Sequence, residues 1–229
     1  SPIFGLMVYF LFGRSGLTKH TRERMDAVNR QVEALFQRDS AVEKGLEKES
    51  RSAYLQSSYI DKWAGFPLYQ NTQTKYYSCG EEMFPDMLEA LCGAKHFIFL
   101  EYFIIEEGYM FNTILDILEE KAKAGVDVRF IYDDVGSINS ISFGYYKKLQ
   151  ERGIPCVTFN PFKPLISVVM NNRDHRKIFV VDGYIGFTGG INLADEYINK
   201  VKRFGYWKDT GVRIEGEAVW SLTAMFLEM

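Results

Sequence analysis

Cysteine is scarce in this chain of 229 residues, which leaves little material for a metal site. The three cysteines, Cys79, Cys92 and Cys156, are odd in number and far apart. They match neither the paired spacing of a zinc site nor that of a redox pair. We therefore expect reduced, partly buried thiols, the usual state in a cytoplasmic compartment, and no bound metal.

An excess of positive charge is also absent. The 27 Lys and Arg residues are outnumbered by 30 Asp and Glu residues, so the formal net charge is −3 and the pI is near 5.7. Proteins that bind the nucleic-acid backbone normally carry a basic surplus. The sequence therefore disfavours a nucleic-acid partner, although a local basic patch is compatible with this composition.

No apolar run is long enough to cross a bilayer as a helix. The run from Pro2 to Phe12 is nearly all apolar, but a spanning helix needs about 20 residues. Such a run could be a buried core helix or an amphipathic segment. A basic cluster of the kind found on the cytoplasmic flank of membrane segments follows at once: Arg14, Lys19, His20, Arg22 and Arg24. Because the chain does not begin with Met, we interpret residues 1–12 as the end of a transmembrane or membrane-embedded segment.

The composition that is present suits a large core, with 47% apolar and 15% aromatic residues. From about Lys75 onward, strand-like apolar runs alternate with helix-like stripes. Strands are expected at 97–103, 126–132, 156–159 and 211–214, and helices at 81–93, 111–124, 141–152 and 217–229. This alternation predicts an α/β layered domain over residues 61–229, with a mixed β-sheet flanked by helices. Residues 13–60 would form a basic flank and a helical linker.

One short segment carries most of the functional information: H-R-K-I-F-V-V-D-G-Y-I-G-F-T-G-G-I-N, residues 175–192. Asp182-Gly183 is a strong hairpin signal between two apolar runs. On a strand, residues two apart share a face, so His175 and Lys177 would project together. The segment therefore predicts an imidazole beside an ammonium group at the start of a hairpin.

The end of the same segment completes the pattern. Gly189-Gly190 would let the backbone turn tightly and approach a ligand closely. Asn192 would sit at the mouth of a following helix, where free N–H groups favour an anion. An imidazole, an ammonium, an amide and a helix N-terminus at one point indicate a phosphate site with its own nucleophile.

Phosphodiester exchange assigns roles to these residues. His175 can be the nucleophile if one ring nitrogen is deprotonated and an acceptor, such as a carboxylate, holds the other. Asp209 is our first choice for that acceptor and Glu196 the alternative. Lys177 and Asn192 would bind the non-bridging oxygens, so no metal or other cofactor is required. Asp182 belongs to the motif, but its place in the turn favours hydrogen bonds to backbone. Four residues near strand ends could line the site or be structural: Glu101, Tyr102, Asp133 and Ser137.

The spacing H-x-K-x4-D-x6-G-G-x-N resembles the signature of the phospholipase D superfamily. The surrounding sequence is closer still to bacterial cardiolipin synthases of the phospholipase D type. The similar segments run across nearly the whole chain: 12–14, 94–95, 101–102, 125–137, 159–161, 172–177, 195–197, 207–210 and 214–216. One departure is Asp174, because the family usually has Asn before the His. A carboxylate there would modestly favour the protonated imidazole.

The resemblance implies a phospholipase D-like fold and a phosphatidyltransferase. His175 would take a phosphatidyl group from phosphatidylglycerol as a phosphohistidine and pass it to a second phosphatidylglycerol, giving cardiolipin and glycerol. It supports Asp209 as the orienting acid. We group Lys177, Gly189, Gly190, Asn192 and Glu196 as substrate-binding residues. The implied location is the bacterial inner membrane, with anionic lipid as partner and the domain on the cytoplasmic side.

Family members also carry a second, homologous half whose histidine protonates the departing alcohol. Only one H-x-K is present in this sequence, so residues 61–229 would be the first of two catalytic half-domains. We expect the chain to be nearly inactive without a C-terminal half or a homodimer partner. Two alternatives remain: a hydrolytic phospholipase or nuclease with the same histidine chemistry, and a catalytically silent membrane scaffold.

Overall fold

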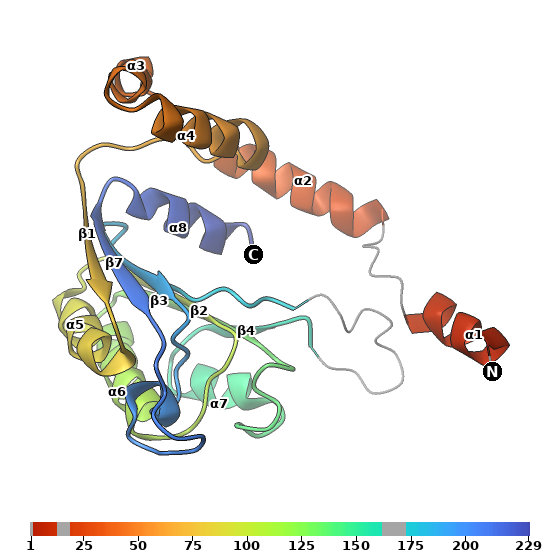
Figure 1. The fold of residues 1–229 in the computed structure, drawn as a ribbon. Helices are drawn as coiled ribbons and strands as arrows, with labels where there is room; N and C mark the ends of the chain where they lie inside the picture. Colours follow the sequence, from red (N-terminus) through yellow and green to blue (C-terminus); the bar gives the residue numbers. More distant parts are fainter. Residues whose placement is uncertain (1, 13–18, 162–172) are drawn as a thin grey trace.

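The computed structural model describes residues 2–12, 19–161 and 173–229. Within these residues, seven strands form one mixed sheet in the order β1-β7-β6-β5-β2-β3-β4 (Figure 1). The strands are β1 (Thr72–Tyr77), β2 (Phe97–Tyr102), β3 (Asp127–Asp133), β4 (Cys156–Phe159), β5 (Ile178–Val181), β6 (Ile185–Gly189) and β7 (Gly211–Gly216). The predicted α/β class and mixed sheet are confirmed.

Strand direction decides where the functional residues meet. β2, β3 and β4 run parallel, whereas β5, β6, β7 and β1 pair antiparallel. β5 lies beside β2 with Ile178 opposite Glu101. The carboxyl ends of β2 and β3 and the first residues of β5 therefore share one end of the sheet, the lower end in Figure 1. We call it the motif end, because His175 and Lys177 directly precede β5.

Two layers of helices cover the sheet. Helices α5 (Gly80–Gly93), α6 (Tyr109–Lys123) and α7 (Tyr145–Glu151) lie on one face, and α8 (Val219–Leu227) on the other (Figure 1). Side chains of β2 alternate between these layers: Ile98 and Leu100 join the first core, and Phe99 stacks on Phe226 of α8 at 4.7 Å between ring centroids. A strand buried on both faces explains the continuous apolar run in the sequence.

Four helices precede the sheet: α1 (Pro2–Phe12), α2 (Lys19–Glu33), α3 (Ser40–Glu49) and α4 (Arg51–Ala64). Val32 of α2 and the following Phe36 pack against Ala224 of α8, so α2 is attached to the body of the domain. Among the described residues, no helix combines the length and apolar character that crossing a bilayer requires. Gly13, Arg14 and Asn172, which contribute to the family resemblance, lie outside the described residues.

The helix expected from Ile141 begins only at Tyr145. Gly144, the residue before it, has a φ of 74°, a left-handed conformation that an α-helix does not contain. Residues 141–144, which include Ile141 and Phe143, therefore belong to the loop after β3. The loop between β3 and α7 at the motif end is therefore longer than predicted.

Candidate active site

His175 and Lys177 lie together at the motif end, as their spacing predicts. The imidazole is exposed, whereas only 4% of Lys177 is accessible. Lys177 Nζ lies 3.3 Å from His175 Nδ1 and 3.4 Å from Nε2, and it donates a 2.7 Å hydrogen bond to the His175 carbonyl oxygen. Because Nζ is almost equidistant from both ring nitrogens, it points along neither lone pair. The ammonium therefore lies beside the imidazole without occupying either ring nitrogen.

Phe103, the first residue after β2, forms the floor of this pair. Its ring centroid is 4.6 Å from that of His175, and Lys177 Nζ lies 5.5 Å from the centroid. Burial lowers the pKa of Lys177, and the negative charges of Asp209 and Asp174 oppose this effect. The site thus combines a partly desolvated cation with a solvent-accessible imidazole.

The backbone before His175 is fixed by Asp133, at the end of β3. Its carboxylate accepts hydrogen bonds from the N–H of Asp174 at 3.1 Å and of Gly136 at 2.8 Å, and Arg173 Nη1 approaches to 3.4 Å. Asp133 is 1% exposed, so these bonds are shielded from water. Asp133 therefore positions the histidine segment and does not line an open pocket.

A buried carboxyl pair lies beneath the same segment. Arg176 Nε is 3.0 Å from Asp174 Oδ1 and 2.8 Å from Glu101 Oε1, but its N–H is aligned only with Asp174. Burial, and then the neighbouring Asp174 carboxyl, raise the pKa of Glu101 to about 9, against the opposing effect of Arg176. Glu101 is therefore protonated near neutral pH, and one cation serves two carboxyl groups.

Asp209, whose charge acts on Lys177, is packed against Gly189 and Gly190. A Cβ atom on Gly190 would overlap the Asp209 carboxylate, and one on Gly189 would overlap the Thr210 carbonyl. The sequence predicted that these glycines let the backbone approach a ligand closely. In the structure they let it approach Asp209 and Thr210 instead. Asp209 accepts a 2.8 Å hydrogen bond from the N–H of Thr210. Among the described residues, no hydrogen bond joins a carboxylate to the His175 ring.

Asn192 is placed differently from the expectation. No α-helix follows it; the next element is the short 3₁₀ helix η1 (Asp195–Ile198). Its side chain is 2% exposed, accepts a 3.0 Å hydrogen bond from the N–H of Ile104 and donates at 2.9 Å to the Tyr197 hydroxyl. The predicted helix N-terminus is therefore wrong, because Asn192 ties the loop after β2 to η1.

Asp182 and Glu196 are not brought to His175. Asp182 lies in the β5–β6 turn, at the other end of β5, and accepts hydrogen bonds of 2.7–2.9 Å from three consecutive N–H groups, those of residues 95–97. These bonds outweigh partial burial and lower its pKa. Glu196 Oε1 instead lies 3.6 Å from Arg203, which also approaches Glu106. The structure thus gives Asp182 a role in attaching the turn to β2.

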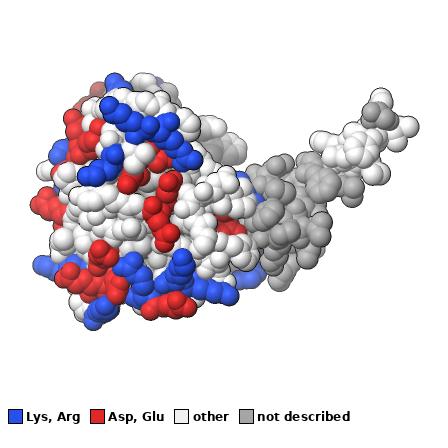
Figure 2. Space-filling view, turned by 90° about the horizontal axis from the view of Figure 1, so that it is seen from below, with Lys and Arg blue, Asp and Glu red and all other residues white. Residues whose placement is uncertain are grey.

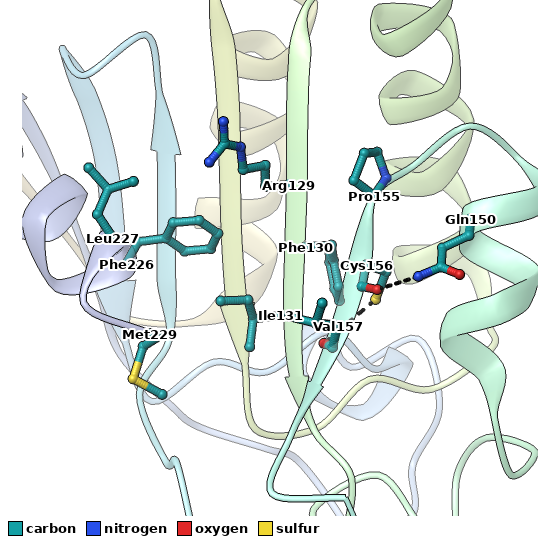
Figure 3. Close-up of a pocket in the computed structure, with 10 residues that line it drawn as sticks. All are labelled: Arg129, Phe130, Ile131, Gln150, Pro155, Cys156, Val157, Phe226, Leu227 and Met229. Carbon is teal, nitrogen blue, oxygen red and sulfur yellow. Dashed lines mark hydrogen bonds between the residues drawn. The ribbon is translucent and has the colours of Figure 1, made fainter. Parts of the chain in front are cut away.

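An apolar pocket of about 310 Å³ lies elsewhere, beside the edge strand β4 (Figure 3). Its walls include Ile131, Val157 and Phe226. None of the motif residues lines it, so it does not take part in the chemistry of the motif end.

Comparison with known proteins agrees with this geometry. The sequence profile of the family described as "Cardiolipin synthase, PLD-like domain" matches residues 87–214. The chain belongs to this family. An uncharacterized protein of Streptococcus mutans is 46% identical and covers 91% of this chain and 46% of its own length. Cardiolipin synthase 2 of Bacillus anthracis is 35% identical and covers 99% of this chain and 44% of its own length. The chain thus spans less than half the length of these relatives.

The solved structures agree on the fold. The phospholipase D family member Nuc of Salmonella typhimurium matches with a TM-score of 0.50 at 20% identity, covering 69% of this chain and 91% of that chain. At this level of identity the likeness concerns the fold alone. It is the phospholipase D-like fold that the motif predicted.

Sequence reasoning missed three residues of this phospholipase D-like site. Phe103 was counted as part of a strand, although it lies beyond β2 and contacts the histidine ring. Arg176 was passed over, although alternation places it opposite His175 and Lys177, toward Glu101. Tyr197 belongs to a segment of the resemblance but received no role, because only the fold brings its hydroxyl to Asn192. Of the other strand-end candidates, Tyr102 is buried in the core, and Ser137 Oγ accepts from Ile105 N–H and donates to the Phe103 carbonyl.

Proposed function

We propose that the protein containing this chain is a phosphatidyltransferase that makes cardiolipin and glycerol from two molecules of phosphatidylglycerol. The observation that carries the proposal is the pairing of an exposed His175 with a buried Lys177 in a member of the cardiolipin synthase family. The exposed ring can reach a phosphodiester, and the cation lies where negative charge would develop.

In the proposed reaction, a His175 ring nitrogen attacks phosphorus, forming a P–N bond while the P–O bond to glycerol breaks. A hydroxyl of a second phosphatidylglycerol then attacks phosphorus and gives its proton to the group that protonated the glycerol, while the P–N bond breaks and cardiolipin leaves. Lys177 would stabilise the phosphate oxygens in both steps. The Asn192 amide group has a second N–H besides the one given to Tyr197, and we propose it as a further donor.

We propose Asp209, supported by Gly189 and Gly190, as the carboxylate that tunes the pair. Its charge reaches Lys177, whereas Glu196 is engaged by Arg203. Asp209 would thus act on the nucleophile through the lysine charge, and through a direct contact with His175 once the site is assembled.

The departing glycerol needs a proton, and the described residues offer no second histidine at the motif end. Relatives that are about twice as long support a second half as the source, and a second copy of the chain is the alternative partner. We propose that the chain alone turns over poorly. The exposed α1 supports attachment to an anionic bilayer, for which we propose the bacterial inner membrane with the domain on its cytoplasmic side.

The test uses membranes that contain the full-length protein and phosphatidylglycerol labelled in its headgroup. Cardiolipin and labelled glycerol are expected, and His175→Ala should lower their formation by at least about a thousandfold, because the covalent step is lost. His96→Ala, the same change on an exposed histidine at the other end of the sheet, is the control and should leave the rate unchanged. Turnover by His175→Ala near the normal rate would refute the proposed nucleophile.

One observation favours a second candidate, a phospholipase D-type hydrolase. Water can reach His175 as easily as a lipid hydroxyl can, because the ring is exposed in this chain. Phosphatidic acid with glycerol, in place of cardiolipin, would identify hydrolysis. The net charge of −3 argues against the nuclease form of the same chemistry.

A further inference from the structure

A closed loop projects from the motif end between η1 and β7 (Figure 1). Asn199 fixes its base: its Oδ1 accepts the N–H of Trp207 at 2.6 Å, and its Nδ2 donates to the Trp207 carbonyl and to Glu81 Oε1, both at 2.8 Å. The Trp207 ring packs on Tyr197 with centroids 5.1 Å apart. Residues 200–206, which we call the clasped loop, therefore leave and rejoin the domain at one fixed point.

The clasped loop exposes apolar side chains. Val201 is 51% exposed, Phe204 74% and Tyr206 65%. Two residues of the loop after β3 are exposed at the same end of the sheet, Ile138 at 45% and Phe143 at 86%. Large apolar groups gathered on one end of a domain mark a surface that is covered by something else.

The charge of this stretch differs in sign from that of the whole chain. Residues 199–208 contain four cations and no acid, although the chain carries −3. Arg203 is 3.4 Å from Glu106 and 3.6 Å from Glu196, so its charge is balanced within the domain. Lys202 and Lys208 are exposed, and Lys200 lies over the Tyr109 ring at 4.5 Å. Figure 2, which views this end, shows basic side chains beside acidic ones and uncharged surface.

We infer that the clasped loop, with Ile138 and Phe143, docks on the surface of an anionic lipid bilayer. Its apolar side chains would enter the headgroup region while its lysines meet lipid phosphates. Aliphatic Val201 and Ile138 favour a bilayer over single-stranded nucleic acid, which binds by stacking on aromatic rings. The contact turns the motif end, and with it His175, toward the membrane. The inference rests on the proposed function only in taking phosphatidylglycerol as the anionic lipid.

The test measures binding of residues 1–229 to vesicles made of equal parts phosphatidylcholine and phosphatidylglycerol. The double variant Val201→Ser, Phe204→Ala should lower the partition coefficient at least about tenfold, because two inserted side chains are removed. Tyr184→Ser is the matched control: it removes an equally exposed apolar residue, 57%, from the opposite end of the sheet, and binding should not change. The exposed α1 is present in every variant, so its contribution cancels in the ratio.

The electrostatic part has its own signature. Lys200→Gln with Lys202→Gln should weaken binding to the phosphatidylglycerol vesicles about fivefold or more per lysine, and should have no effect on vesicles of phosphatidylcholine alone. High salt should remove this difference. Far-ultraviolet circular dichroism melts establish that each variant is folded at the assay temperature.

The outcomes separate this inference from the proposed reaction. Equal binding by the folded loop variants and the parent would overturn it, as would loss of single-stranded DNA binding with vesicle binding unchanged. His175→Ala should bind vesicles as the parent does while losing lipid transfer. If no preparation forms cardiolipin but the loop variants still detach, the proposed function fails and the docking surface stands.

Discussion

Burial works against the charge of Lys177 in its place beside His175. Only 4% of the side chain is accessible, and desolvation lowers the pKa of its ammonium. Asp209 and Asp174 counteract that loss from two sides. The cation beside His175 is therefore sustained by carboxylates that need not touch the substrate, which is why their substitution would alter the reaction through the lysine.

Glu101 provides a test in the pH dependence of stability. Its pKa is raised to about 9 in the folded state from an ordinary value of 4.5, so ionisation favours the unfolded chain between these two pH values. The parent should lose stability as pH rises through this window, by up to about 1.4 kcal/mol per pH unit. Glu101→Gln removes this loss. Urea unfolding should find the variant increasingly more stable than the parent from pH 5 to 9.

The pKa of Glu119 is shifted in the opposite direction from that of Glu101. Lys123 and Arg152 lower its pKa, so its contribution to stability is lost only as pH falls. The stability difference between Glu119→Gln and the parent should thus stay constant above pH 5 and shrink as pH falls below that value. A stability difference for Glu101→Gln that did not grow with pH would mean that Glu101 is ionised in the folded protein.

Which residues belong to the site could be predicted from the sequence better than which residues they contact. The spacing of His175 and Lys177 was enough to place them together, because side-chain alternation is local. The backbone partner of Asn192, Ile104, is 88 residues away along the chain, and the three partners of Asp182 are 85 to 87 residues away, so only the fold brings them near. No local pattern could have told that Asp209 would face Gly190 and Lys177.

At the scale of the β5–β6 hairpin, we expect different effects from substituting Gly189 and Gly190. A Cβ on Gly190 meets the movable end of the Asp209 side chain, whereas a Cβ on Gly189, at φ 147°, meets the Thr210 backbone. Gly190→Ala should displace Asp209 and lower lipid transfer at least about tenfold, with stability changed by less than about 1 kcal/mol. Gly189→Ala should cost about 2–4 kcal/mol. Thermal melts and transfer rates on both variants check this.

Gly93→Ala is the control for the glycine pair, because nothing lies within 4 Å of its added methyl group. It should change neither stability nor rate appreciably. A Gly190→Ala variant with full activity would remove Asp209 from the working site.

The turn of the same hairpin should matter for stability. Asp182 has a φ of 53° and Gly183 of 66°, the positive pair typical of a type I′ turn, and the Asp182 carboxylate accepts three backbone N–H bonds at the start of β2. Asp182→Ala should cost about 2–3 kcal/mol at pH 7, measured by urea unfolding. The pKa of Asp182 is lowered, so the difference from the parent should shrink as pH falls below about 4. A constant difference down to pH 2 would contradict the role of its charge.

Elements could be predicted where composition is locally decisive. The apolar runs of β2 and β5 and the Asp-Gly turn gave strands and hairpin correctly. The start of α7 and the absence of a helix after Asn192 could not be foreseen, because they depend on the left-handed Gly144 and on tertiary bonds of the Asn192 amide.

At the scale of the molecule, the described residues place one histidine, His175, at the motif end and no second histidine there. The isolated chain should show at most about a thousandth of the full-length rate, because the second histidine that would protonate the leaving alcohol is not among the described residues. Adding the remaining half should restore transfer. If two copies assemble the site instead, the specific rate of the chain should rise with its concentration. A full rate that is independent of concentration would show that one copy suffices.

Asn199 closes the base of the clasped loop through hydrogen bonds to the Trp207 backbone. Changes within residues 200–206 should therefore not be transmitted to the strands of the sheet. Amino acids between Asn199 and Trp207 can change without moving the strand ends that hold His175 and Lys177. The stretch is thus a natural place for adaptation: exchanging it between relatives should carry a preference for one headgroup mixture along with it, while the chemistry at phosphorus stays as it was.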